Sequence, residues 1–291
     1  MIRTHNVGNL KISSVIEYYG PTHDPSMFPG SNAADLKANA DWLVPDYYVP
    51  SMDKLVIVMR IWVVRVEDKI ILIDAGVGNG KTRTRARANM LNTLTQLWLE
   101  SVGATRDSVT HVLMTHLHGD HVGWNTVWED GKWRPTFPNA RYLIPRKDYE
   151  YFKAAHDVKP DDMLVQGFHD SILPIMEAGL GDFVESGDVV ADIFRVSEMP
   201  GHTPGMLGYW FESSGQSGVF CGDMFHHPIQ IHNPQWNSPP DIDLEMARQS
   251  RVAFLKEVAG SGTLIMPCHF SPPGCGFVRQ VDGGYIYEPL R

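Results

Sequence analysis

Three histidines and one aspartate lie within a six-residue segment that directly follows an apolar run. The residues are His116, His118, Asp120 and His121. The run before them, 109–115, is short and rich in β-branched side chains, which predicts a buried strand that ends where the cluster begins. Burying several titratable side chains together is costly unless a metal ion or hydrogen bonds satisfy them. The cluster therefore predicts a metal site.

The spacing of these side chains indicates that the cluster can serve two metal ions. His116 and His118 are two residues apart, so in an extended segment they point to the same side. Asp120 and His121 are expected in the following turn, where they can face a second point nearby. Imidazole and carboxylate together suit zinc, iron or manganese, whereas an all-oxygen set would suit magnesium or calcium.

Three further polar side chains stand where other apolar, strand-like runs stop. His202 lies in a turn rich in Pro and Gly. Asp223 follows the run 218–221, and His269 follows the run 263–268. If these junctions converge at one edge of a sheet, the three side chains can complete the coordination of two ions. Taken singly, each has an ordinary alternative as a turn histidine, a helix N-cap aspartate or a loop histidine.

The order of these motifs resembles the metallo-β-lactamase superfamily. The matching segments are His-x-His-x-Asp-His at 116–121, Gly-His-Thr-Pro-Gly at 201–205, Gly-Asp at 222–223 and the late His269. The resemblance implies an α/β fold, an αββα sandwich in which two mixed sheets pack face to face with helices outside. It also implies that Asp74, at the end of an apolar run, supports the site from behind the metal ligands.

The resemblance further implies a ligand set and a cofactor. Three ligands would hold a first ion, three would hold a second, and one would bridge both: His116, His118 and His202; Asp120, His121 and His269; and Asp223. The cofactor is then two divalent metal ions, zinc in the first place, with iron, manganese or cobalt as alternatives.

Such a site predicts hydrolysis by a metal-bridging hydroxide. Two divalent ions about 4 Å apart lower the pKa of a shared water toward about 7, which supplies a nucleophile at neutral pH. A carbonyl or phosphoryl oxygen that coordinates one ion gains stabilisation of the developing negative charge. No Gly-x-Ser-x-Gly elbow occurs in the sequence. The candidate catalytic residues are Asp120, Asp223 and His226.

Among hydrolases of this superfamily, the sequence is most similar to the branch of N-acyl homoserine lactonases and methyl parathion hydrolase. The shared features include a long N-terminal extension and the segment 223–228 running into 235–237. The lactonases commonly carry a tyrosine three residues after the bridging aspartate, where this chain has His226. That histidine could donate a hydrogen bond or act as general acid toward a leaving group. The alternative is a loop histidine that makes backbone contacts.

Length and hydrophobic patterning give the frame that must hold the site. The 291 residues are 43% hydrophobic and contain no repeat or low-complexity linker, which favours a single domain over residues 1–291. We expect residues 1–54 to form an extension that contributes to the pocket entrance. Strands are predicted at 55–66, 69–74, 140–144 and 206–211, and helices at 90–101, 146–155 and 244–258.

Charge and composition exclude several classes of partner. The formal net charge of −9 argues against a nucleic-acid surface. The one dense basic stretch, 81–87, is expected to be a solvated helix face or loop. No apolar stretch of membrane-spanning length and no signal-peptide pattern is found, so we expect no membrane partner and a cytoplasmic or already processed chain. Three cysteines, an odd number, fit small buried side chains rather than a disulfide framework.

The predicted substrate is a small, neutral, partly hydrophobic lactone or carboxylic ester. Few basic residues are expected near the metal-ligand segments, because Arg248, Arg251 and Lys256 lie in a predicted helix and are expected to face solvent. A ligand pocket is typically apolar, so we expect two or more of a group of large apolar residues to line it. The group is Met27, Phe28, Trp42, Tyr47, Tyr48, Trp124, Phe225 and Trp236.

Other functions remain as alternatives. A phosphotriester is neutral too and is the main rival substrate. A thioesterase, a mononuclear iron dioxygenase and a zinc-stabilised binding module are less favoured, the last because structural zinc sites are usually closed four-ligand sets. A homodimer is compatible with the sequence.

Overall fold

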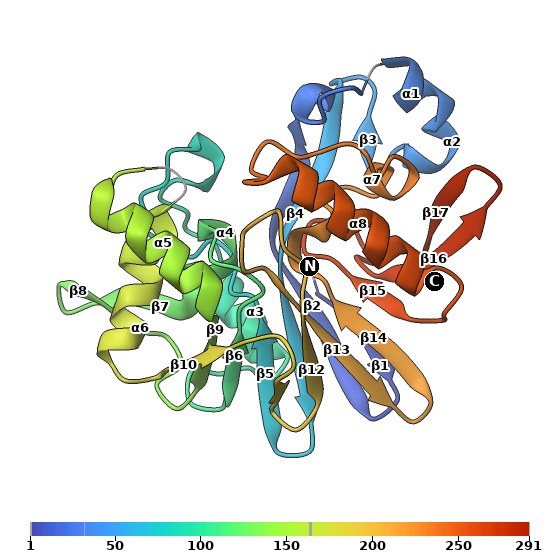
Figure 1. The fold of residues 1–291 in the computed structure, drawn as a ribbon. Helices are drawn as coiled ribbons and strands as arrows, with labels where there is room; N and C mark the ends of the chain where they lie inside the picture. Colours follow the sequence, from blue (N-terminus) through green and yellow to red (C-terminus); the bar gives the residue numbers. More distant parts are fainter. Residues whose placement is uncertain (1, 32, 163–164, 291) are drawn as a thin grey trace.

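The computed structural model describes residues 2–31, 33–162 and 165–290. Their strands form two large mixed sheets and one small hairpin (Figure 1). The first sheet has the order β1-β2-β4-β5-β6-β9-β10, with β3 paired to β4. Its strands are β1 (Ile2–Val7), β2 (Leu10–His23), β3 (Tyr48–Val49), β4 (Lys54–Val66), β5 (Lys69–Ile73), β6 (His111–Leu113), β9 (Arg141–Pro145) and β10 (Gly181–Val184).

The second sheet follows chain order from β11 to β17. Its strands are β11 (Val189–Val190), β12 (Phe194–Glu198), β13 (Leu207–Ser213), β14 (Gln216–Phe220), β15 (Leu264–Met266), β16 (Gly276–Val281) and β17 (Gly284–Pro289). The hairpin pairs β7 (Thr126–Glu129) with β8 (Lys132–Pro135). Parallel pairing occurs from β5 through β6 and β9 to β10, and between β14 and β15. Three of these parallel strands, β6, β14 and β15, end shortly before predicted ligand segments.

Helices cover the outer sides of both sheets (Figure 1). The α-helices are α1 (Ala33–Ala38), α2 (Ala40–Leu43), α3 (Thr95–Ser101), α4 (Gly119–Val122), α5 (Arg146–Val158), α6 (Leu173–Glu177), α7 (Ile229–His232) and α8 (Leu244–Val258). In Figure 1, α5 and α6 lie beside the first sheet and α8 lies beside the second.

Three hydrophobic clusters account for this layering. One cluster joins residues of both sheets, for example Trp62 and Leu113 of the first with Phe220 and Met266 of the second, and is the core between them. A second packs the outer face of the first sheet against α3 to α6. A third packs the second sheet against α7, α8 and the N-terminal helices. Removal of apolar side chains from water at these interfaces stabilises the αββα sandwich expected from the sequence, which is confirmed.

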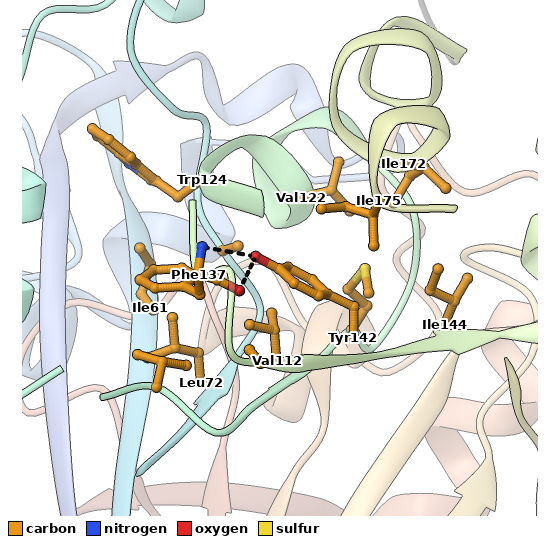
Figure 2. Packing of buried hydrophobic residues seen from close by; sticks show 14 of the residues in the cluster. Ile61, Leu72, Val112, Val122, Trp124, Phe137, Tyr142, Ile144, Ile172 and Ile175 are labelled. Carbon is orange, nitrogen blue, oxygen red and sulfur yellow. Dashed lines mark hydrogen bonds between the residues drawn. The ribbon is translucent and has the colours of Figure 1, made fainter. Parts of the chain in front are cut away.

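Figure 2 shows how the core beside the first sheet anchors the segment after β6. Tyr142 lies within this cluster, and its hydroxyl accepts a hydrogen bond from the Phe137 amide at 3.0 Å. Val122, the last residue of α4, packs into the same cluster together with Trp124. The short helix that carries Asp120 and His121 is thereby fixed against the sheet.

Most predicted elements occur within a few residues of their expected bounds. The helix expected at 90–101 begins only at Thr95, because Met90 has a left-handed φ of 51° and the Thr93 amide donates to the side chain of Asn79 instead of a helical carbonyl. Asp120 and His121 were expected in a turn and lie in α4 instead. The single domain over residues 1–291, with 1–54 as an extension, stays a prediction.

The basic stretch 81–87 differs most from the sequence expectation. Lys81 is fully buried, and its ammonium group donates to the hydroxyls of Thr126 at 2.6 Å and Ser171 at 3.0 Å. Arg83 is buried and forms a two-pronged ion pair with Asp170 at 2.6 and 3.1 Å. Burial lowers the pKa of Lys81 to about 7. The expected solvated face is therefore wrong for these two residues.

Replacement of Asp170 by asparagine is expected to lower the free energy of unfolding by about 3 kcal/mol. The change removes the carboxylate that pairs with the buried Arg83 and lies 3.5 Å from the Lys81 amine. Urea denaturation measures this. Asp130→Asn is the matched control, since Asp130 pairs with Arg134 on the surface, and we expect a change below about 1 kcal/mol. A loss in Asp170→Asn no larger than in the control contradicts the role given to this pair.

Two composition-based expectations can be compared with the structure. The cysteines Cys221, Cys268 and Cys275 are free and buried, as expected. Among the described residues, no helix combines the length and the hydropathy needed to cross a membrane.

Candidate metal centre

The predicted ligand residues follow the ends of several strands, which bring them together. The segment after β6 carries His116 and His118, the loop before β13 carries His202, and the turns after β14 and β15 carry Asp223 and His269. All of these side chains are buried. The predicted convergence at one sheet edge thus occurs, from both sheets at once.

Four of the predicted ligands form one group. His116, His118, His202 and Asp223 each offer a nitrogen or oxygen atom, and these atoms lie within 4.8 Å of one another. His118 Nδ1 is 2.9 Å from His202 Nε2, and His202 Nε2 is 3.2 Å from Asp223 Oδ2. His116 Nε2 is 3.7 Å from the same carboxylate oxygen. This group corresponds to the first predicted ion.

The other three predicted ligands form a second group. Asp120, His121 and His269 also offer atoms within 4.8 Å of one another. Asp223 Oδ1 faces this group, at 3.2 Å from His121 Nε2 and 3.0 Å from His269 Nε2. One carboxylate therefore lies between both groups, which is the position that the sequence resemblance implied for Asp223.

The chemistry of the donor atoms fits divalent metal ions. Among the described residues, the Nε2 atoms of His116 and His121 and one oxygen of Asp223 are buried without a hydrogen-bond partner. Buried polar atoms without partners are costly, so this arrangement favours a ligand that would coordinate them. Burial lowers the pKa of His118 to about 3, whereas hydrogen bonds to Asp223 and Asp241 outweigh burial at His202 and raise its pKa to about 9. Neutral imidazoles and carboxylates are the donors that zinc and related metals prefer.

Partners behind the ligands fix their orientation. Asp74 accepts hydrogen bonds from His121 Nδ1 at 2.8 Å and from the Thr115 amide at 2.7 Å. The Val58 carbonyl accepts from His269 Nδ1 at 2.7 Å. When Nδ1 carries the hydrogen, Nε2 presents its lone pair to the centre. Cys268 also approaches, and its Sγ contacts Asp74 Oδ2 at 3.1 Å.

Asp241 is a supporting residue that the sequence did not reveal. Its carboxylate accepts from His202 Nδ1 at 2.8 Å and from the Ser238 amide at 2.9 Å. Arg251 lies 3.5 Å from the same carboxylate and is buried. The expectation that Arg251 faces solvent is therefore wrong. In the sequence Asp241 stands close to Asp243, the N-cap of α8, as one of two aspartates before a helix, so its position carries no signal for this role.

Asp148 joins two ligand loops and was also missed. It accepts hydrogen bonds from the Thr203 hydroxyl at 2.8 Å, the Gly205 amide at 2.6 Å and the Leu117 amide at 3.2 Å. Burial raises its pKa to about 6. In the sequence it resembles an acidic residue in the first turn of a helix, where carboxylates are common.

His226 is oriented by a chain of hydrogen bonds. Gln230 Nε2 donates to Ser238 Oγ at 3.2 Å, so the Ser238 hydroxyl can donate to His226 Nδ1 at 2.8 Å. Burial lowers the pKa of His226, and the neutral ring then carries its hydrogen on Nε2. That nitrogen is 3.1 Å from Asp223 Oδ2. His226 therefore presents a hydrogen-bond donor to the middle of the site.

A cavity of about 250 Å³ opens on the site. His118, Asp120, Asp223, His226 and His269 line it on the side of the metal centre. The other walls are largely apolar. The N-terminal segment contributes Tyr18 and Met27 to them, and later segments contribute Ile57, Met59, Val77, Ala88, Pro239 and Pro240.

Two expectations about this cavity are wrong. Of the large apolar residues proposed to line it, only Met27 does. The others pack elsewhere, as in the stack of Phe28 on Trp236, with ring centroids 6.3 Å apart, and the buried pairing of Tyr47 with His227. The second wrong expectation is that few basic residues lie near the ligand segments. Arg83, Arg85 and Arg87 line the cavity.

Two curated proteins match part of the sequence of this chain. The hydroxyacylglutathione hydrolase of Rhodospirillum rubrum is 34% identical over 128 residues, which cover 43% of this chain and 36% of that protein. An uncharacterised Bacillus subtilis protein, YobT, is 24% identical over 128 residues, which cover 44% of this chain and 51% of its own length. The chain thus spans about half or less of these two curated relatives.

Solved structures resemble the whole chain. The hydrolase AbOPH, of the beta lactamase superfamily, is 24% identical with a TM-score of 0.82, covering 100% of this chain and 97% of its own. The dizinc quorum-quenching lactonase AidC, solved with a product, is 23% identical with a TM-score of 0.79 and the same coverage. At these identities the similarity shows a shared fold. A family model described as the metallo-beta-lactamase superfamily matches residues 60–286, well over half of the sequence. The chain belongs to the metallo-beta-lactamase superfamily.

Proposed function

We propose that this chain is a metal-dependent hydrolase that cleaves a lactone or carboxylic ester with the help of two divalent metal ions. The observation that carries the proposal is the position of Asp223, whose two oxygens face both predicted ligand groups. When bound, two such ions would lower the pKa of water toward about 7 and polarise a carbonyl oxygen. Zinc is the favoured metal, because the donors are imidazole and carboxylate.

The proposed ligands would be His116, His118 and His202 for one ion, and Asp120, His121 and His269 for the other. Asp223 would serve both. The dizinc lactonase AidC shares this fold over its length, which supports the number and identity of the ions proposed here.

His226 would act on the substrate rather than on the ions. Its Nε2 lies at the centre of the site, 3.1 Å from Asp223 Oδ2. A donor at this position can stabilise negative charge on a reacting oxygen or transfer a proton to a leaving alkoxide. Because the ring is held by Ser238, the donor is oriented before a substrate binds.

The choice of substrate rests on the cavity. Its apolar walls fit an acyl or alkyl part, and a volume of about 250 Å³ fits a small ligand. The relatives include a lactonase and a hydroxyacylglutathione hydrolase, so an acyl bond with an oxygen or sulfur leaving group is favoured. We do not carry over the neutral substrate expected from the sequence, because basic residues line the cavity.

A substrate panel on zinc-loaded protein tests the proposal. The panel holds lactones, aryl and alkyl esters, phosphotriesters and thioesters, compared by kcat/KM. The proposal predicts that a lactone or carboxylic ester exceeds every phosphotriester by at least about tenfold, or about 1.4 kcal/mol of transition-state stabilisation. A phosphotriester that exceeds every ester and lactone by that factor would replace this proposal by organophosphate hydrolysis.

Replacement of His226 by phenylalanine is expected to reduce kcat about 10²-fold on lactones and alkyl esters, because their leaving alkoxide needs a proton. The loss should be smaller on para-nitrophenyl esters, whose leaving group needs none. Steady-state kinetics on both classes measures the difference, with His5→Phe, in β1, as the control. An equal loss on both classes contradicts proton donation by His226.

A further inference from the structure

Two arginines of one cavity wall have no carboxylate partner. Arg85 and Arg87 line the cavity from the short 3-10 turn at 86–88. Arg85 is exposed and Arg87 is partly buried, so they belong to its outer part. Among the described residues, neither forms an ion pair within 4 Å. Their charges are therefore available to a ligand.

The third arginine of the cavity differs from these two. Arg83 is buried and its guanidinium is already engaged by both oxygens of Asp170. This ion pair is structural, so Arg83 adds little positive charge to the cavity. The charge of Arg83 is therefore neutralised, unlike the charges of Arg85 and Arg87.

Arg87 is oriented by a neutral residue. Its guanidinium donates to His23 Nε2 at 2.5 Å, and His23 Nδ1 contacts the Thr22 hydroxyl at 2.9 Å. Burial, together with the nearby arginines, lowers the pKa of His23 to about 3, so the imidazole stays uncharged. The contact fixes the guanidinium without cancelling its charge, and a guanidinium has further N–H groups to donate.

The charge balance of the cavity favours an anion at this end. Among the described residues that line it, the only carboxylates are Asp120 and Asp223, and both belong to the proposed metal centre. Two divalent ions would more than offset them. An apolar stretch that includes Ile57, Met59 and Val77 also lines the cavity.

Resting on the proposed function, we propose that the ester or lactone substrate carries a carboxylate group that binds Arg85 and Arg87. An aliphatic segment would separate this carboxylate from the scissile carbonyl and pack on the apolar wall. A guanidinium suits a carboxylate because it can donate two parallel hydrogen bonds. The chain is then an esterase or lactonase for acyl groups with a terminal carboxylate.

Matched esters test the charge preference. One compound is the mono-para-nitrophenyl ester of adipic acid, whose far end is a carboxylate. The other is the para-nitrophenyl ester of adipamic acid, whose far end is a neutral amide. Zinc-loaded protein is expected to prefer the carboxylate ester by about tenfold in kcat/KM, which corresponds to about 1.4 kcal/mol. The preference should fall as salt is raised, because Arg85 is exposed.

Variants then assign the preference to the two arginines. In Arg85→Gln/Arg87→Gln, the kcat/KM ratio of the two esters should fall toward one, mainly through the KM of the carboxylate ester. Arg85→Lys/Arg87→Lys keeps the charge and should retain part of the preference. Arg279→Gln, an exposed arginine of β16 paired with Glu288, is the matched control and should keep it. An unchanged ratio in the double Gln variant overturns the proposal.

A binding measurement separates this proposal from the proposed function. Anilides of the two acids, in which an amide replaces the ester, are titrated calorimetrically. If neither ester is cleaved but the carboxylate anilide binds about tenfold tighter in an arginine-dependent way, the hydrolase proposal fails and the anion site stands. If both esters are cleaved equally well and both anilides bind equally, the anion site fails and the hydrolase proposal stands.

Discussion

Replacement of Asp223 by asparagine is expected to lower kcat/KM on the order of 10³-fold, because two-ion chemistry supplies several kcal/mol of transition-state stabilisation. The two carboxylate oxygens of Asp223 face both candidate ligand groups around the centre. Asparagine has nearly the same volume but carries no charge, and its amide hydrogens would face imidazole nitrogens that should bind metal. The variant should lose metal more readily than it loses its fold.

Three measurements on Asp223→Asn separate these effects. Circular dichroism reports the fold, elemental analysis reports bound metal, and kinetics on the best substrate of the panel reports activity. Asp192→Asn is the control, because this aspartate is exposed and makes only a 3.6 Å contact with Lys69. Near-normal turnover by a folded Asp223→Asn protein contradicts the bridging position.

Removal of metal is expected to have the larger effect, reducing hydrolysis to the rate without enzyme. The Nε2 atoms of His116 and His121, which lie 3.7 and 3.2 Å from the Asp223 carboxylate, then have no coordinating ion. The same removal should lower the melting temperature, because a ligand that binds only the folded state stabilises it by about 4 kcal/mol at a thousand times its Kd. Chelation followed by calorimetry and a kinetic assay measures both.

The choice of metal added back provides the control for this experiment. Zinc should restore activity and thermal stability together. Magnesium should restore neither, because it prefers all-oxygen ligands in octahedral geometry. Recovery of activity and thermal stability with magnesium alone contradicts a metal site built from imidazole and carboxylate ligands.

The sequence could indicate which side chains would lie together because that information is local. The pair His116 and His118 shows its shared direction through spacing alone, and each remaining ligand follows a short apolar run that ends a strand. Convergence of those ends follows from the sheets, whose existence the apolar runs also indicate. Ligand roles for these residues stay a proposal until metal is measured.

The supporting residues could not be predicted because their partners are distant in the chain. Asp148 binds a loop 55 positions away, and Arg60 donates to carbonyls of Pro267 and Phe270 more than two hundred positions away. The sequence does not distinguish an aspartate in a helix or an arginine in a strand that holds a distant loop from one that does not. Their role depends on tertiary placement.

The placement of the basic segment 81–87 also depends on a distant partner, and missing it led to a wrong expectation for the charge of the cavity. A run of positive charge is usually solvated, and the sequence near 81–87 gives no sign that Asp170 lies against Arg83. Once that ion pair fixes the segment, Arg85 and Arg87 are carried to the cavity. The large apolar residues failed as pocket predictions for a related reason, because pairs such as Phe28 and Trp236 pack against each other.

Titration of metal-free protein with zinc, followed by the rate of ester or lactone hydrolysis, tests the central claim most directly. The two ligand groups around Asp223 predict that activity rises with added zinc and reaches its plateau at two ions per chain. Elemental analysis of the plateau sample should give the same stoichiometry. Full hydrolytic activity in protein that holds well below one metal ion per chain would contradict a metal-dependent hydrolase.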